Sequence, residues 1–142
     1  MLTMEVALHL PVAPDLELVA AKAAEVLGSH LGMPQSQVEA VCVATIEACL
    51  NAIEHGGEPG FVVRLRGETH GERPRLIVEV EDHGEGFNPT EAAASPSPSR
   101  VLGCTARRGW GLTLIRELVD DVQIDSQPGR TVVQMFKYVE TE

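Results

Sequence analysis

The sequence has few cysteines and few positive charges, and each shortage argues against a class of protein. Its three cysteines (Cys42, Cys49 and Cys104) are an odd number without the spacing of a disulfide framework, so we expect a reducing, cytoplasmic setting. Lys and Arg number 11 against 21 Asp and Glu, which gives a formal net charge of −10. This balance argues against nucleic acid as a partner, because phosphate binding needs a basic face, and it suits contact with a basic patch on another protein.

Long apolar runs are also missing. No uninterrupted apolar stretch approaches the roughly 18 residues that suggest a membrane span. The first ten residues carry no positive charge and are interrupted by Glu5 and His9, which favours a strand over a signal peptide. We therefore expect no membrane partner. A chain of 142 residues without an internal repeat fits one domain, residues 1–142, with one core.

The spacing of the apolar residues predicts strands and helices along most of the chain. Alternation predicts a first strand that ends at Pro11, followed by strands over 61–66 and 75–82 and a final hairpin over 122–125 and 131–138. Helical spacing predicts helices over 16–31, over 36–54 and after Gly111. Helices grouped apart from the strands predict an α/β (α+β) two-layer sandwich, in which a mixed, mostly antiparallel sheet is covered on one face by about three helices.

Several local features accompany these elements. Asp15 is a candidate N-cap for the first helix, whose apolar side we expect at Leu16, Val19, Ala23, Val26 and Leu27. Ser36 is a candidate N-cap for the second helix, with Glu39 as its capping-box partner. Residues 88–108 are rich in Ala, Ser and Pro, which is typical of a mobile loop.

The second predicted helix carries two polar residues, Glu47 and Asn51, one turn apart. At about 100° per residue, the apolar stripe of this helix contains Val38, Val41, Cys42, Thr45, Ile46, Cys49 and Ile53. Glu47 and Asn51 fall on the opposite side, among alanines. One interpretation is a solvated face with a local pair between the two side chains. The other is a flat wall for a ligand, where an amide oxygen suits Mg²⁺ and a carboxylate can accept a proton.

A carboxylate also ends the strand over 75–82. One face of this strand carries apolar side chains at alternate positions, Leu76, Val78 and Val80, and Asp82 continues that face. Asp82 should therefore point toward the helix layer, where a carboxylate needs a hydrogen-bond partner. Its partner is either its own backbone, as in many Asp-x-Gly turns, or an amine of a ligand.

The third predicted helix begins at a glycine pair, Gly109 and Gly111. A helix start presents free amides and a positive dipole end, which suit phosphate oxygens, and glycine lets that backbone approach closely. Arg107 and Arg108 precede the pair, either as help in holding phosphate or as part of a solvated turn. This is no Walker loop, because the Gly-Lys-Ser/Thr ending of that motif is absent.

Together, the three motifs resemble the N, G1 and G2 boxes of the GHKL (Bergerat-fold) ATP-binding superfamily. They run from Glu47 to Asn51, from Asp82 to Gly86 and from Gly109 to Leu112. Length and motifs are most similar to those of the anti-sigma-factor serine/threonine kinases. Histidine kinases, topoisomerases and mismatch-repair ATPases of the superfamily need further domains.

The resemblance implies a role for each motif. It makes Glu47 the general base and Asn51 the Mg²⁺ ligand, and it places the adenine amino group on Asp82. It implies a nucleotide site formed by Asn51, Asp82, Gly84, Gly86, Arg108, Gly109, Gly111, Leu112 and Thr131. Residues 88–108 would be a lid over the ATP. The implied partners are an antagonist protein of STAS-like type as substrate, a sigma factor as alternative partner, and a second copy of the chain in a homodimer.

The sequence thus leads to one main functional hypothesis and two rivals. The main hypothesis is a cytoplasmic, ATP-dependent serine/threonine kinase of the anti-sigma type. A second is an ATP-gated module that binds its partner without transferring phosphate. The third is an interaction domain that binds no nucleotide and carries the motifs by coincidence.

Overall fold

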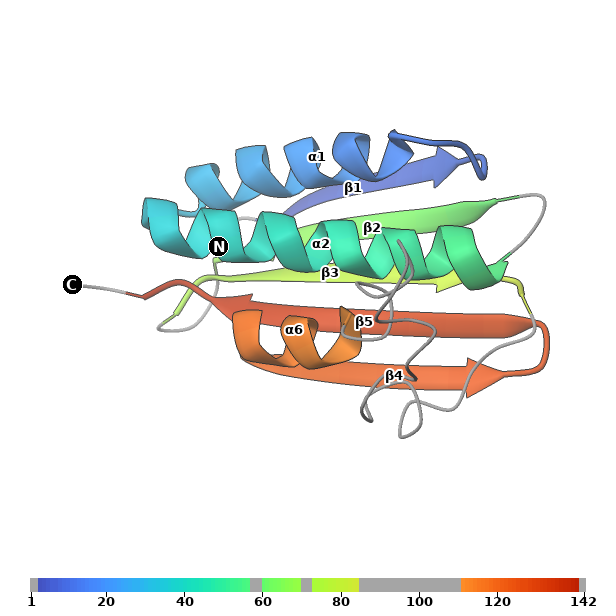
Figure 1. Ribbon diagram of the computed structural model, residues 1–142. Coiled ribbons are helices and arrows are strands. Elements are labelled where there is room, and N and C mark those ends of the chain that lie inside the picture. Colours follow the sequence, from blue (N-terminus) through green and yellow to red (C-terminus); the bar gives the residue numbers. More distant parts are fainter. Residues whose placement is uncertain (1–2, 57–59, 70–72, 85–110, 141–142) are drawn as a thin grey trace, which may run out of the picture.

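Five antiparallel strands form one sheet in a computed structural model that describes residues 3–56, 60–69, 73–84 and 111–140. In the sheet the strands follow the order β1-β2-β3-β5-β4 (Figure 1). Their bounds are β1 Thr3–Leu10, β2 Phe61–Glu68, β3 Arg75–Asp82, β4 Asp121–Gln127 and β5 Arg130–Tyr138. Every pairing among these strands is antiparallel. The prediction of a mostly antiparallel sheet is therefore confirmed, and the described strands contain no parallel pair.

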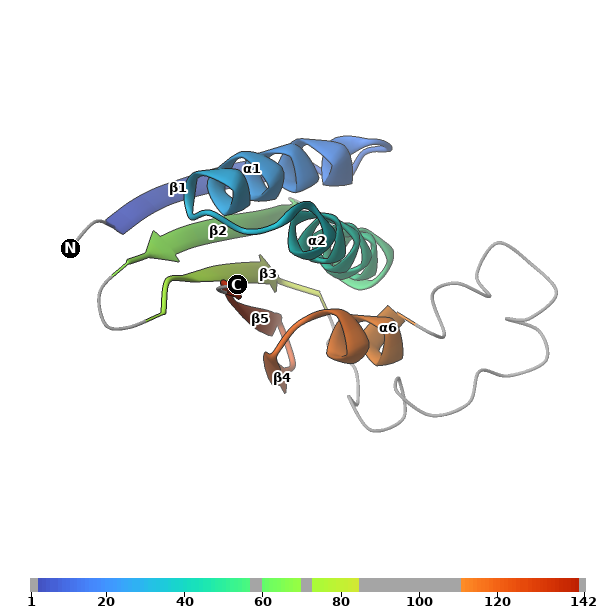
Figure 2. The same ribbon diagram turned by 90° about the vertical axis from the view of Figure 1, so that its left-hand side faces the viewer.

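The described helices lie together on one face of the sheet, so the predicted two-layer sandwich is confirmed (Figures 1 and 2). These helices are α1 Leu16–His30, α2 Gln35–Gly56 and α6 Gly111–Leu118. Helix α2 lies between α1, on the β1 side, and α6, on the side of β5 and β4. The opposite face of the sheet, which we call the outer face, carries none of these helices.

The core forms between the helices and the inner face of the sheet because strand residues alternate between the two faces. Two rows of apolar side chains cross the inner face in register. One row contains Val6, Leu65, Val78 and Met135, and the next contains Leu8, Val63, Val80 and Val133. Leu112 and Ile115 of α6, together with Val119 just after the helix, complete the core.

Helix α2 is the centre of the helix layer. Its length and mean hydropathy of 1.2 would suffice for a membrane span, although the sequence showed no uninterrupted apolar run. In this fold 56% of that window is buried inside the protein, as in the core helix of many soluble folds. The Cys42 thiol on one side of α2 donates a hydrogen bond to the carbonyl oxygen of Ala21 in α1 (3.5 Å).

Helix α1 turns a different side to the core than the sequence predicted. Small residues form its buried side, together with one leucine: Ala20, Ala21, Ala24, Leu27 and Gly28. Val19 and Val26, expected in the core, are each 45% exposed. The physical reason is close packing, because alanine and glycine let α1 approach α2 and the sheet in a way that valine would prevent.

Both predicted N-caps are corrected as well. Asp15 does stand at the N-cap of α1, but its backbone is left-handed (φ 74°) and its side chain makes no capping hydrogen bond. Helix α2 begins at Gln35, one residue earlier than expected, and Pro34 supplies the carbonyl that accepts from the amides of Gln37 and Val38. Ser36 therefore lies inside the first turn, where it cannot cap the helix.

The C-terminal end of α6 is fixed to the sheet by side chains. Lys137 of β5 donates from Nζ to the carbonyl oxygen of Leu118 (2.9 Å), which satisfies a carbonyl at the end of the helix. Asp120 accepts a hydrogen bond from the amide of Tyr138 (2.7 Å). Strand β4 begins directly afterwards and runs in the direction opposite to α6. The N-terminal end of α6 therefore faces the end of the sheet where β3 finishes (Figure 1).

Candidate functional site

The row of inner-face residues at the end of β3 carries polar side chains on β3, β5 and β4, where the neighbouring rows are apolar. Asp82 lies opposite Phe61 of β2 and Thr131 of β5, and Thr131 lies opposite Ser126 of β4. Asp82 and Thr131 are both buried. The hydroxyl oxygens of Thr131 and Ser126 are 3.1 Å apart and share a hydrogen bond. Two of the residues predicted to form the nucleotide site, 49 positions apart in sequence, are thus cross-strand neighbours.

Asp82 points toward the helix layer, as the alternation of β3 predicted. A Cβ atom placed on Gly56, the last residue of α2, would lie 2.8 Å from the Cβ of Asp82. The Oδ1 of Asp82 accepts a hydrogen bond from the amide of Gly84 (3.0 Å). The turn interpretation of this Asp-x-Gly sequence is therefore confirmed, and it leaves room for a ligand amine at the same carboxylate, which has about four acceptor positions.

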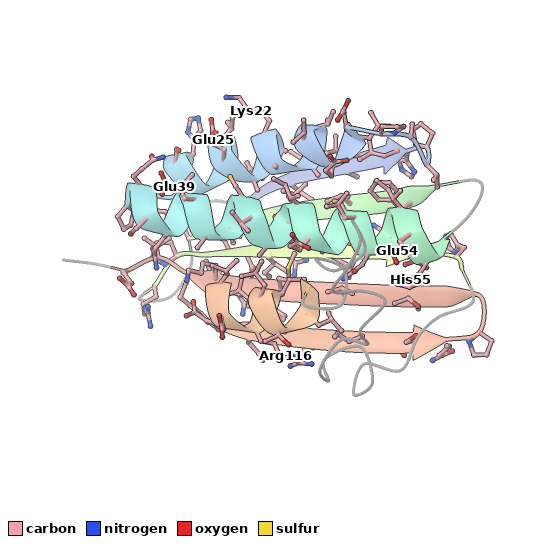
Figure 3. All side chains as sticks on the ribbon, in the orientation of Figure 1. Lys22, Glu25, Glu39, Glu54, His55 and Arg116 are labelled. Atoms are coloured by element: carbon pink, nitrogen blue, oxygen red, sulfur yellow. The ribbon has the colours of Figure 1, made fainter. Side chains whose placement is uncertain are left out.

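Burial raises the pKa of the Asp82 carboxyl above its ordinary value of 3.8. The Gly84 amide and the positive potential of His55 and His83 oppose this shift but do not cancel it. His55 lies with Glu54 at the end of α2 (Figure 3). The charged form of this carboxyl therefore lowers the stability of the fold, and ionisable groups with such a shifted pKa are typical of functional sites.

Gly84 is required by the close approach of two backbones. A Cβ atom at this position would collide with the carbonyl oxygen of His55 and would lie 2.7 Å from the Cα of Gly56. The resemblance implies a place for this glycine in the nucleotide site, and in the structure its immediate neighbour is the end of α2. The carbonyl oxygen of Gly84 also accepts from the amide of Gly129 in the β4–β5 turn (3.0 Å).

Glu47 and Asn51 do not lie on a solvated face, which excludes the first of the two interpretations given above. Their exposed fractions are 1% and 7%. Helix α6 packs against α2, and Ala44 of α2 lines a small cavity with Val119 and Met135. The carboxylate and the amide are therefore buried on the central helix of the layer.

The remaining predicted site residues fall into two groups. Gly111 opens α6, and Leu112 is a buried core residue, so that only its backbone amide can contact a ligand. Gly86, Arg108, Gly109 and the predicted lid over 88–108 lie outside the described residues. The roles assigned to individual residues of the site stay predictions.

The donor set suits a magnesium ion that is shared with a ligand. The described ranges contain no group of three or more His, Cys, Asp or Glu side chains that could hold a metal alone. Glu47 and Asn51 offer hard oxygen atoms, and Mg²⁺ in nucleotide sites takes one or two protein ligands together with phosphates and waters. Asn51 would hold the ion in such an arrangement.

One group of residues near the site was missed by the sequence analysis. Glu81, next to Asp82, is buried on the outer face between two arginines, Arg64 and Arg130. Glu81 lies opposite Val62 of β2 and Val132 of β5, so it reaches both arginines diagonally across the outer face. Without the strand order, these pairings were invisible in the sequence.

Comparison with known proteins agrees with this geometry. Residues 11–137 match the family model described as histidine kinase-like ATPase domain. The serine-protein kinase RsbW of Bacillus subtilis is 29% identical over 119 residues, which cover 82% of this chain and 74% of that protein. The RsbW of Bacillus cereus (strain Q1) is 30% identical over 82% of this chain and 73% of its own. The anti-sigma F factor of Thermoanaerobacter sp. is 30% identical over 72% of this chain and 71% of its own.

Two solved structures share the fold. The RsbU and RsbW domains of Rv1364c from Mycobacterium tuberculosis align with a TM-score of 0.68 and 17% identity, covering 97% of this chain and 33% of that one. The SiaB–SiaC complex from Pseudomonas aeruginosa aligns with a TM-score of 0.59 and 15% identity, covering 94% and 89%. These similarities concern the fold alone.

The fold and the polar end row define an ATP-binding domain with helices on one face of an antiparallel sheet. The chain belongs to the histidine kinase-like ATPase domain family, in its group of anti-sigma-factor serine kinases.

Gly84→Ala should disrupt both the fold and the site. The added methyl group forces the end of α2 away from β3, and we expect a loss of about 2–3 kcal/mol in the free energy of unfolding, measured by urea denaturation. Gly28→Ala is the matched control, because its Cβ would meet mainly the flexible Met33 side chain at 3.2 Å. Equal stability of both variants would contradict the packing described for Gly84.

Asp82→Asn should separate stability from binding. The folded state raises the pKa of this carboxyl, so its protonated form is more compatible with the fold than its charged form. The wild type therefore becomes less stable as pH rises above 3.8 and the carboxyl ionises. At pH 7 the ligand-free Asn variant should therefore melt at or above the temperature of the wild type, while its ATP affinity in calorimetry falls at least tenfold. A variant that melts lower, or that binds ATP normally, would refute this assignment.

Proposed function

We propose that the protein uses ATP to phosphorylate a serine or threonine of an antagonist protein and thereby controls a sigma factor. The observation that carries this proposal is the end row, in which buried Asp82 and Thr131 lie side by side against the last turn of α2. Helix α2 also holds Glu47 and Asn51, one to three turns before that point. The carboxylate proposed to bind the base, at the end of β3, and the candidate catalytic carboxylate, on α2, thus lie on two elements that are in direct contact at Gly56.

Each side chain has a distinct part in this proposal. The Asp82 carboxylate accepts a hydrogen bond from the exocyclic amine of adenine, and Thr131 supports it from the neighbouring strand. Asn51 orients the phosphates through Mg²⁺, which would neutralise the charge that develops on them. Glu47 accepts the proton of the attacking hydroxyl, and the first turn of α6 offers amides to the phosphate oxygens.

The proposed partners are proteins rather than nucleic acids. Relatives named serine-protein kinase support a protein serine as the substrate, and a relative named anti-sigma F factor supports a sigma factor as the controlled protein. The formal charge of −10 suits a basic patch on either partner.

A specific observation also favours a second candidate, an ATP-gated binding module without phosphotransfer. Glu47 is 1% exposed, whereas a general base must reach the hydroxyl of a partner protein. In this alternative, ATP binding changes the affinity for the partner, and the buried Glu47 has a structural role in the packing of α2. The two candidates predict the same ATP affinity and differ only in the transfer step.

Glu47→Gln decides between them. We expect the variant to bind ATP with unchanged affinity in calorimetry. The rate of label transfer from γ-labelled ATP to the serine or threonine of the cognate antagonist should fall by about 10²–10⁴. Glu39→Gln, at the exposed start of the same helix, should leave both values unchanged. Absence of transfer by the wild type, with intact ATP binding, would favour the gated module.

We further propose a homodimer that forms through a surface at one edge of the sheet. Strand β1 pairs only with β2 among the described strands, so its other edge is open to a further strand. Beside it, Leu18, Val19 and Val26 of α1 are exposed next to a groove lined by Val6 and Leu8. An open strand edge flanked by apolar side chains suits pairing with a second copy of the same surface.

Sedimentation velocity tests this dimer. The wild type should sediment as a dimer, and Val19→Glu should shift it to a monomer because it places a charge in the apolar surface. Val43→Glu is the matched control, since Val43 is an equally exposed valine on α2, away from the β1 edge. A monomeric wild type, or a dimer that survives Val19→Glu, would exclude this surface.

A cytoplasmic location is proposed with the function. Cys42 and Cys49 are free thiols, as expected in a reducing compartment. Burial raises the pKa of Cys49 to about 12, so this thiol stays protonated and unreactive.

A further inference from the structure

The outer face of the sheet carries a network of ion pairs directly behind the end row. Glu81 of β3 accepts from Nη1 of Arg64 in β2 (2.8 Å) and from Nε of Arg130 in β5 (3.0 Å). Its carboxylate is thus shared by both neighbouring strands. Arg64 also donates to Glu79 (2.9 Å), one row further from the end of the strand.

Glu81 and its partner Arg130 each adjoin a residue of the candidate site in the chain. Asp82 follows Glu81 directly and points to the other face, because successive residues in a strand alternate. Thr131 follows Arg130 in the same way. The Glu81–Arg130 pair on the outer face therefore links the two backbone segments that carry Asp82 and Thr131 on the inner face.

A second link closes the same end of the sheet. The amide of Gly129, which precedes Arg130, donates to the carbonyl oxygen of Gly84 (3.0 Å). Between these two links lie Asp82 and its turn. The β4–β5 turn is thus held to the end of β3 both before and after the proposed adenine-binding carboxylate.

We infer that Glu81 is a positioning residue for adenine recognition, which fixes Asp82 relative to Thr131 by holding β2 and β5 against the end of β3. This inference rests on the proposed function. Glu81 itself lies on the outer face, so it acts on the base only through the strand backbone.

The geometry separates Glu81 from its neighbour Glu79. Both are acidic residues of β3 on the outer face, and both bind Arg64. Only Glu81 also binds Arg130, and only Glu81 adjoins Asp82 in the chain. Arg130 is 55% exposed at its side chain, so it remains solvated when its partner is removed. Loss of the Glu81 carboxylate should therefore loosen the end of the strand without unfolding the protein.

The test compares ATP with inosine triphosphate (ITP), which lacks the exocyclic amine. Calorimetry with the full chain and Mg²⁺ measures both affinities for wild type, Glu81→Gln and the matched control Glu79→Gln. We expect Glu81→Gln to weaken ATP binding roughly tenfold, less than the ~100-fold effect that a 1 Å misplacement can have. ITP affinity should change less than twofold, and Glu79→Gln should resemble the wild type. Arg130→Gln should reproduce the effect, and the double variant should be no weaker than either single one.

Two results would overturn the inference. In one, Glu81→Gln binds ATP as tightly as Glu79→Gln does. In the other, it weakens ATP and ITP equally, as general destabilisation would. If Glu81→Gln does not fold, Arg130→Gln carries the same comparison. A wild type that binds neither nucleotide would instead refute the proposed function, and wild-type binding is measured first for that reason.

Discussion

The burial of one carboxylate at the end of β3 is the constraint on which the rest of this structure depends. Asp82 continues the apolar face of its strand, so its charge lies where Leu76, Val78 and Val80 would predict another aliphatic side chain. Burial raises its pKa, and the fold compensates with the Gly84 amide and the nearby histidines. Glycine is required at this point, at Gly56 and Gly84, because α2 and the end of β3 approach each other too closely for a side chain.

The other features of the site follow from that arrangement. Because the end of α2 is fixed against β3, Glu47 and Asn51 on the preceding turns of α2 are held in fixed, buried positions. Because β5 pairs with β3, Thr131 and Asp82 lie directly opposite each other on adjacent strands. The site is therefore built on rigid elements, which keeps its side chains in one geometry.

The sequence predicted the strands, the helices and the inward direction of Asp82, because alternation and helical spacing are local patterns. It failed where a neighbour distant in the chain decides the outcome. The spacing within residues 36–54 left a solvated face open for Glu47 and Asn51, because the burial of that side depends on residues distant in the chain. For α1, the wheel favoured valines over alanines, whereas close helix packing buried the alanines. The ion pairs of Glu81 could not be predicted, because they depend on which strands are neighbours in the sheet. The family resemblance did not give that order residue by residue.

The most direct measurement of the central claim is a crystal structure of the full chain with Mg²⁺ and a non-hydrolysable ATP analogue. The account predicts that the exocyclic amine of adenine lies within about 3 Å of the Asp82 carboxylate. It also predicts that Thr131 lies beside the base and that Asn51 faces the phosphates. A nucleotide bound elsewhere, with Asp82 engaged only by the Gly84 turn, would contradict it.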